Sequence, residues 1–282
     1  MANKINNGKH DIVGTVVYYR RFRSRYPILE RDILVWLPPS YKKERGRYYP
    51  VLYMHDGQNI LDPTTSYAGQ DWRVDETVTK LIKSNQIEEP IVVGIYNTPE
   101  RLQEYCVSEK GDHYLKFIVE ELKHFIDSNF RTLADREATA IMGSSMGGLC
   151  SLRMVWRYPH VFGKAGCLSS SFYFGEDAIF DIIESTHEKK NVKIYFDSGE
   201  DGKKDAQRMF CLLTQKGLVL GENFDYYFDR GAGHNEWSWA NRLERPLKYF
   251  WKIINFKQTG FSGQFNTHQF EFKNLALEDE RQ

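Results

Sequence analysis

A serine between two glycines is the clearest chemical signal in this chain of 282 residues. Residues 143–147 read Gly-Ser-Ser-Met-Gly, after an apolar stretch at 138–142 and before a helical apolar pattern. A buried strand, a sharp turn around G-x-S-x-G and a helix form the setting of a nucleophile elbow. Ser145 would stand at the tip of the turn. The amide of Met146, at the helix N-terminus, could donate to an oxyanion.

The bare G-x-S-x-G pattern occurs by chance in roughly one chain in ten of this length, so an ordinary strand-to-helix turn is the alternative. A nucleophilic serine in this setting needs an acid and then a histidine further along the chain. His234 meets that order, because it follows the last expected strand and precedes the last expected helix. His55 is its rival as general base, but it lies after the third strand, where the oxyanion loop belongs.

The acid has three candidates in the loop after the seventh expected strand. Asp201 is favoured over Asp197, which directly ends the strand, and over Glu200, which is expected to face solvent. The acid would hold the imidazole in the correct tautomer and stabilise its charged form. An oxyanion hole would combine the amide of Met146 with one from Gly57 or Gln58, although a plain turn is the alternative reading of that loop.

Short apolar strands alternate with amphipathic helices along the chain, which predicts an α/β fold with a mostly parallel sheet covered on both faces. Strands are expected at residues 12–19, 32–37, 50–55, 91–96, 138–142, 165–168, 192–196 and 224–228, and helices at 72–82, 113–128, 146–159, 206–216 and 237–254. The first two of these eight strands are expected to be antiparallel. The candidate residues above then gather where parallel strands end, which is where function collects in such sheets.

We expect one catalytic domain over residues 1–255. The segment 256–282 carries several phenylalanines and is expected to pack on the body or on a partner. Residues 168–192 leave no room for a large lid domain.

Charge and composition exclude several classes of function. Lys+Arg and Asp+Glu both number 38, which gives no global basic field for nucleic acid. A local cluster, Arg20, Arg21, Arg23 and Arg25, reads as a solvated strand end. The cysteines lack metal-ligand spacing and fit reduced thiols of a cytoplasmic protein; they are Cys106, Cys150, Cys167 and Cys211. No signal-peptide core or membrane-spanning stretch is present, so no membrane partner is expected, and a homo-oligomer stays open.

Four segments together resemble the putative esterase family of α/β-hydrolases, which groups enterochelin esterase-like, feruloyl and acetylxylan esterase-like and esterase D-like enzymes. They are residues 37–41 (LPPSY), 53–59 (YMHDGQN), 143–149 (GSSMGGL) and 233–236 (GHNE). The resemblance spans residues 16–251. It implies an α/β-hydrolase fold with Ser145 as nucleophile, His234 as base, and oxyanion donors in Met146 and the Gly57–Gln58 loop.

A further segment, Arg101 with residues 104–105, resembles a family element near the site. One departure concerns the acid. Relatives usually carry Gly-x-x-acid after the seventh strand, whereas residues 199–202 here read Gly-Glu-Asp-Gly, one residue shorter. This leaves the choice of acid open, together with a Ser–His dyad that needs none.

The sequence thus predicts a serine esterase that works through an acyl-enzyme, with no metal or organic cofactor implied. The substrate would be a soluble polar or aromatic ester: an acyl-sugar or oligosaccharide ester, a feruloyl or acetyl ester, or a siderophore-type lactone. Predicted substrate contacts are Trp72, Arg101, Phe172 and Trp237, with core packing as the alternative for most aromatics. Two other functions stay open: a degenerate hydrolase that serves as a binding or scaffold protein, and a peptidase of the same fold.

Overall fold

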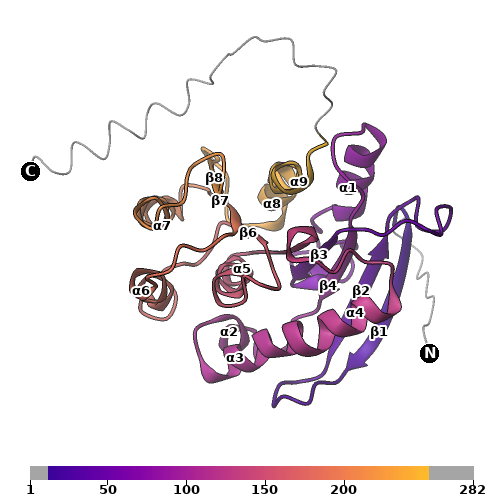
Figure 1. Ribbon diagram of the computed structural model, residues 1–282, viewed down its shortest axis with the longest axis horizontal. Coiled ribbons are helices and arrows are strands. Elements are labelled where there is room, and N and C mark those ends of the chain that lie inside the picture. Colours follow the sequence, from indigo (N-terminus) through magenta and orange to yellow (C-terminus); the bar gives the residue numbers. More distant parts are fainter. Residues whose placement is uncertain (1–11, 254–282) are drawn as a thin grey trace, which may run out of the picture.

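The computed structural model describes residues 12–253 and contains the predicted eight-stranded sheet. The strand order is β1-β2-β4-β3-β5-β6-β7-β8 (Figure 1). The strands are β1 Thr15–Phe22, β2 Arg31–Leu37, β3 Val51–His55, β4 Ile91–Ile95, β5 Thr139–Ser144, β6 Lys164–Leu168, β7 Lys193–Ser198 and β8 Phe224–Phe228. The predicted antiparallel pairing of the first two strands is confirmed, and β2 also runs antiparallel to β4, while all other neighbours are parallel.

Helices cover both faces of this sheet (Figure 1). They are α1 Val74–Lys83, α2 Arg101–Tyr105, α3 Glu109–Lys116, α4 Lys123–Asn129, α5 Met146–Arg157, α6 Ala178–Ser185, α7 Lys203–Gln215, α8 Glu236–Arg242 and α9 Glu244–Trp251. A π-helical segment, Phe117–Leu122, joins α3 to α4, and short 3-10 turns lie at Gly57–Asn59 (η1) and Arg136–Ala138. Of these helices, α2 and α6 were not predicted. The predicted extension at 256–282 lies outside the described residues.

The alternation of side chains along the strands divides the core into two layers. In β2, Ile33 and Val35 pack in the larger core beneath α2 to α7, whereas Leu34 and Trp36 pack in the smaller core beneath α1, α8 and α9. Helix α6 contributes buried residues to the larger core, so the segment between β6 and β7 packs on the body and forms no large lid. Within residues 12–253, none of the helices is both long enough and apolar enough to cross a membrane.

The last predicted helix is wrong as a single element, because the structure divides it into α8 and α9 at Leu243. Pro246 explains the break. Proline has no N–H to donate to the carbonyl four residues earlier, and it is tolerated in the first turn of a helix, which is where α9 places it. The first of the two helices, α8, begins two residues after His234.

A buried ion pair fixes α2 against the sheet. Arg31 on β2 donates to both carboxylate oxygens of Glu104 on α2, at 2.5 and 3.1 Å, and both side chains are almost fully buried. Thr98 also donates its hydroxyl to Glu104 at 3.1 Å. The pair therefore holds α2, a helix of five residues, in one position beside the end of β4.

Replacing Glu104 by Gln should lower the free energy of unfolding by about 3–5 kcal/mol, because Arg31 would stay buried without a countercharge. Denaturant titration followed by circular dichroism measures this. The matched control is Glu44→Gln, whose ion pair with Arg47 is largely exposed and should contribute less than about 1 kcal/mol. Equal losses in the two variants would contradict the importance assigned to the buried pair.

Candidate active site

Ser145 lies at a strained turn between β5 and α5. Its backbone has φ 55° and ψ −120°, a conformation that L-residues rarely adopt. Its N–H donates to the carbonyl of Leu168 at the end of β6, at 2.9 Å. Met146 is the first residue of α5, so its N–H has no acceptor within the helix. The geometry is that of a nucleophile elbow with one amide available to an oxyanion.

His234 and Asp201 meet in the loops after β8 and β7. The Nδ1 of His234 lies 2.9 Å from the Oδ2 of Asp201, and the two side chains are 37% and 47% exposed. The imidazole also stands edge-on to the indole of Trp239, with ring centroids 5.1 Å apart. A hydrogen bond from the Asp229 amide to the Ser198 carbonyl, at 2.9 Å, joins the starts of the two loops.

The hydroxyl of Ser145 has a different partner. Its Oγ lies 3.1 Å from the Oγ of Ser171, and the described residues show no hydrogen bond between Ser145 and His234. Sequence reasoning missed the contact with Ser171. The available signal was its position just after β6, since that strand ends beside the elbow.

The other two candidate acids have different surroundings. Asp197 is buried: its Oδ1 accepts from the Ser169 amide at 3.0 Å and lies 3.1 Å from Arg242, and its Oδ2 accepts from Tyr195 at 3.2 Å. Burial raises the pKa of Asp197 to about 6, against the opposing effect of Arg242. Glu200 is exposed. Of the three, only Asp201 forms an ion pair with His234 in the described structure.

The loop after β3 is held by an ion pair. Asp56 has a left-handed backbone with φ 55°, and its carboxylate accepts two hydrogen bonds from Arg101, at 2.7 and 2.8 Å. Asn97 donates its side-chain amide to the same carboxylate at 2.6 Å, and the backbone amide of Asn97 donates to the Gln58 side chain at 3.2 Å. Arg101 was expected to contact substrate, but its guanidinium is engaged by Asp56. Its position makes it a support of the loop that carries Gly57 and Gln58.

Gly57 has a packing reason to be glycine. A Cβ at this position would lie 2.5 Å from the carbonyl carbon of Gly94 on β4, so η1 could not pack on the strand with any other residue. This packing brings two backbones close together and leaves the amides of η1 at the carboxyl end of β3.

The predicted substrate-contacting aromatics differ in exposure. Trp72 and Phe172 are only 4% and 1% exposed and belong to the two cores, so the alternative of core packing holds for them. Trp237 is 56% exposed, and Tyr67 and Tyr173 are exposed as well. These three lie in segments that follow β8, β3 and β6, at the edge of the sheet where Ser145 lies.

His55 is buried next to the elbow. Its Nδ1 shares a hydrogen bond of 2.9 Å with the Tyr114 hydroxyl, and desolvation lowers its pKa to about 3. The imidazole therefore stays neutral in the folded protein at any ordinary pH. A side chain this buried is unsuited to act as the general base, which agrees with the preference for His234.

One group of acids has oxygens close enough together to hold a metal ion. Ligand atoms of Asp71, Asp75 and Glu76 lie within 4.8 Å of one another at the start of α1. Asp75 accepts from the Val13 amide at 2.6 Å, and Asp71 accepts from the Arg73 amide at 2.9 Å. Burial and the neighbouring Glu76 raise the pKa of Asp75 to about 8. The backbone amides of Val13 and Arg73 donate to Asp75 and Asp71 in this group, and we assign no metal to it.

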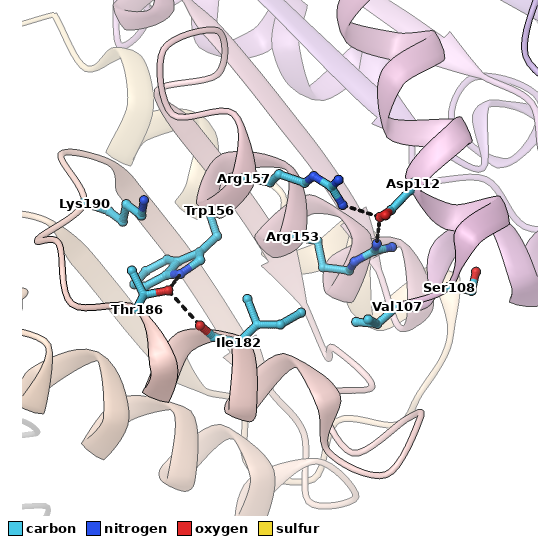
Figure 2. A pocket seen from close by; sticks show the side chains of 9 residues that line it. All are labelled: Val107, Ser108, Asp112, Arg153, Trp156, Arg157, Ile182, Thr186 and Lys190. Atoms are coloured by element: carbon cyan, nitrogen blue, oxygen red, sulfur yellow. Dashed lines mark hydrogen bonds and ion pairs between the residues drawn. The ribbon is translucent and has the colours of Figure 1, made fainter.

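A cavity of about 450 Å³ lies away from Ser145, between the start of α3, the end of α5 and α6 (Figure 2). Its floor is formed by α5 residues that are about 12 Å or more along the helix from the elbow. Arg153 and Arg157 both donate to Asp112 there, the former at 3.0 Å. Its arginines are thus bound within the chain, and the cavity is separate from the catalytic edge.

Comparison with known proteins identifies the family of this chain. The family model described as "Putative esterase" matches residues 25–250. The chain belongs to the putative esterase family. The resemblance stated from the sequence motifs is therefore confirmed, and as a member of this family the chain is a carboxylic ester hydrolase.

Two known proteins are similar to this chain over about three quarters of its length. The Bacillus subtilis protein YbbA, described as uncharacterized, is 26% identical over 246 residues that cover 78% of this chain and 92% of YbbA. An endo-1,4-beta-xylanase/feruloyl esterase of Xylanibacter ruminicola is 32% identical over 222 residues, which cover 77% of this chain and 29% of that protein.

Solved structures share the fold of this putative esterase. A ferulic acid esterase superposes with a TM-score of 0.69 and 19% identity, covering 85% of this chain and 98% of that chain. The enterochelin esterase of Shigella flexneri has a TM-score of 0.69 and 16% identity, covering 86% of this chain and 59% of that chain. The α/β-hydrolase fold is thereby confirmed.

The depressed pKa of His55 predicts a loss of stability in acid. Below pH 6.5 the unfolded chain protonates this imidazole, whereas the folded protein does so only near pH 3. The parent should therefore lose about 1.4 kcal/mol of unfolding free energy per pH unit in this range beyond the loss of a His55→Gln variant. Urea titrations at pH 7.5 and 5.5 measure the difference. Parallel pH dependences would show that His55 titrates normally in the folded protein.

Proposed function

We propose that Ser145, His234 and Asp201 form a catalytic triad that hydrolyses soluble esters. The observation that supports this most directly is the 2.9 Å contact between Asp201 and His234, at the sheet edge where Ser145 occupies its strained turn. The chain order Ser, acid, His is the one that α/β-hydrolases use. Because Asp201 faces Nδ1, the Nε2 of His234 is the nitrogen left to serve the serine.

In this proposal Ser145 Oγ attacks the ester carbonyl carbon while His234 Nε2 takes the hydroxyl proton. The amides of Met146 and the Gly57–Gln58 turn stabilise the oxyanion, and the alcohol leaves with the proton from His234. Water then attacks the acyl-enzyme, with His234 again accepting and returning the proton. Asp201 holds the imidazole tautomer and stabilises its positive charge.

We propose an ester with an aromatic or sugar group as the substrate class. Three aromatic side chains support this, since Tyr67, Tyr173 and Trp237 are 93%, 60% and 56% exposed on the segments around the site. Exposed aromatic faces of this kind stack on planar or sugar rings. The matched proteins whose names mention a substrate, ferulic acid, feruloyl or enterochelin esterases, point in the same direction.

Replacing Ser145 or His234 by Ala should lower kcat by at least about 1,000-fold, because the nucleophile or its base is lost. Asp201→Asn should lower kcat by a smaller factor, about 10 to 100 times less than the factor for Ser145→Ala or His234→Ala. The acid of a catalytic triad contributes less to kcat than the serine and the histidine. Hydrolysis of p-nitrophenyl acetate by variants with parental circular dichroism measures both.

The matched control is Glu200→Gln, the neighbouring exposed carboxylate, which should keep parental activity. A loss in that variant with none in Asp201→Asn would assign the acid to Glu200. Labelling by a fluorophosphonate probe separates an enzyme from a scaffold, because only an activated Ser145 reacts. An anilide analogue of each ester distinguishes an esterase from a peptidase.

Truncating Tyr173 or Trp237 to Ala should raise KM for a feruloyl ester about 3- to 10-fold, the loss expected for one aromatic contact, and leave KM for an acetyl ester nearly unchanged. Tyr48→Ala is the matched control. Tyr48 is 57% exposed but precedes β3, at the opposite edge of the sheet. Equal effects on both esters would remove aromatic stacking from the proposal.

A further inference from the structure

Three consecutive serines follow β6 and lie against the elbow. All three are buried, with exposed fractions between 3% and 7%; they are Ser169, Ser170 and Ser171. Serine is a polar residue that is mostly found at the surface. The end of β6 pairs in parallel with the end of β5, where Ser144 is opposite Leu168. The run therefore starts beside the residue that precedes the proposed nucleophile.

Ser171 contacts Ser145 twice. Its amide donates to the Ser145 carbonyl at 3.1 Å, and the two hydroxyl oxygens are 3.1 Å apart. The next residue, Phe172, is fully buried and packs edge-on against Phe180 and Phe196. The backbone on both sides is thus held in place, which keeps the Cα–Cβ bond of Ser171 beside Ser145.

The other two serines hold this segment against the neighbouring elements. The Ser169 hydroxyl accepts from the buried guanidinium of Arg242 at 2.8 Å, and the Ser169 amide donates to the Asp197 carbonyl at 3.1 Å. Ser170 packs against Gly148 in the first turn of α5, so closely that a Cβ on Gly148 would lie 2.0 Å from the Ser170 oxygen. That oxygen has no hydrogen-bond partner among the described residues.

We propose that Ser171 is a positioning residue for the nucleophile, an inference that rests on the proposed function of Ser145. A hydroxyl has one proton and two lone pairs. If Ser171 donates its proton to Ser145 Oγ, the Ser145 proton stays available to His234 and one lone pair stays available for attack. Ser171 limits the rotation of the Ser145 hydroxyl and itself gains or loses no proton.

The test compares Ser171→Ala with Ser170→Ala, neighbouring buried serines that differ in whether their hydroxyl has a partner. Loss of one net hydrogen bond predicts a fall of about 2- to 10-fold in kcat for p-nitrophenyl acetate and in the rate of fluorophosphonate labelling for Ser171→Ala. KM should change less than about 2-fold, because substrate binding does not use this contact. Ser170→Ala should match the parent in both rates.

A merely structural role for Ser171 would give a different result. It would lower the unfolding midpoint and leave the labelling rate of the folded fraction unchanged, which would overturn the proposal. Should Ser171→Ala fail to fold, Ser171→Cys keeps nearly the same volume without a strong donor and must show the same slow labelling. Full activity of Ser145→Ala would refute the proposed function itself, an outcome distinct from normal rates in the Ser171 variants.

Discussion

The strained backbone at Ser145 is the constraint on which the site depends. A residue held at φ 55° and ψ −120° stores roughly 1–3 kcal/mol that the surroundings must supply. The hydrogen bond from the Ser145 amide to the Leu168 carbonyl connects the turn to β6. The parallel pairing of β5 with β6 determines where the Leu168 carbonyl lies. The position of one hydroxyl is thus decided by the register of two central strands, which are among the most buried parts of the molecule.

Ion pairs that are fully or mostly buried hold the loops around this turn. The pairs are Arg31 with Glu104, Arg101 with Asp56, and Arg242 with Asp197. Such pairs contribute little net stability, because removing two charges from water costs about as much as their attraction returns. What they provide here is orientation: α2 supports the loop after β3 from one side, and Arg242 joins α8 to the ends of β6 and β7 from the other. The loops keep their geometry although they are polar and partly exposed.

Most of the fold could be predicted from the sequence, since buried strands and amphipathic helices have strong periodic signals. The proposed site could be assembled because parallel strands bring their carboxyl ends to one edge, which placed Asp201 and His234 together. The role of Asp197 could not be predicted, because it depends on Arg242, which is 45 positions later in the chain and meets it only in the folded protein. The helix break at Pro246 was available in the sequence and was overlooked. Which aromatic side chains are buried also depends on tertiary packing.

The exposure of the Asp201–His234 pair has a consequence for the fate of an acyl-enzyme. Both side chains lie more than one-third open to solvent, so bulk water reaches the imidazole without a channel. In the proposed mechanism an acyl group on Ser145 would meet an activated water molecule as soon as the first alcohol departs. Another alcohol could accept that group only by outcompeting the solvent at the exposed imidazole. The open geometry thus favours hydrolysis over transfer between alcohols.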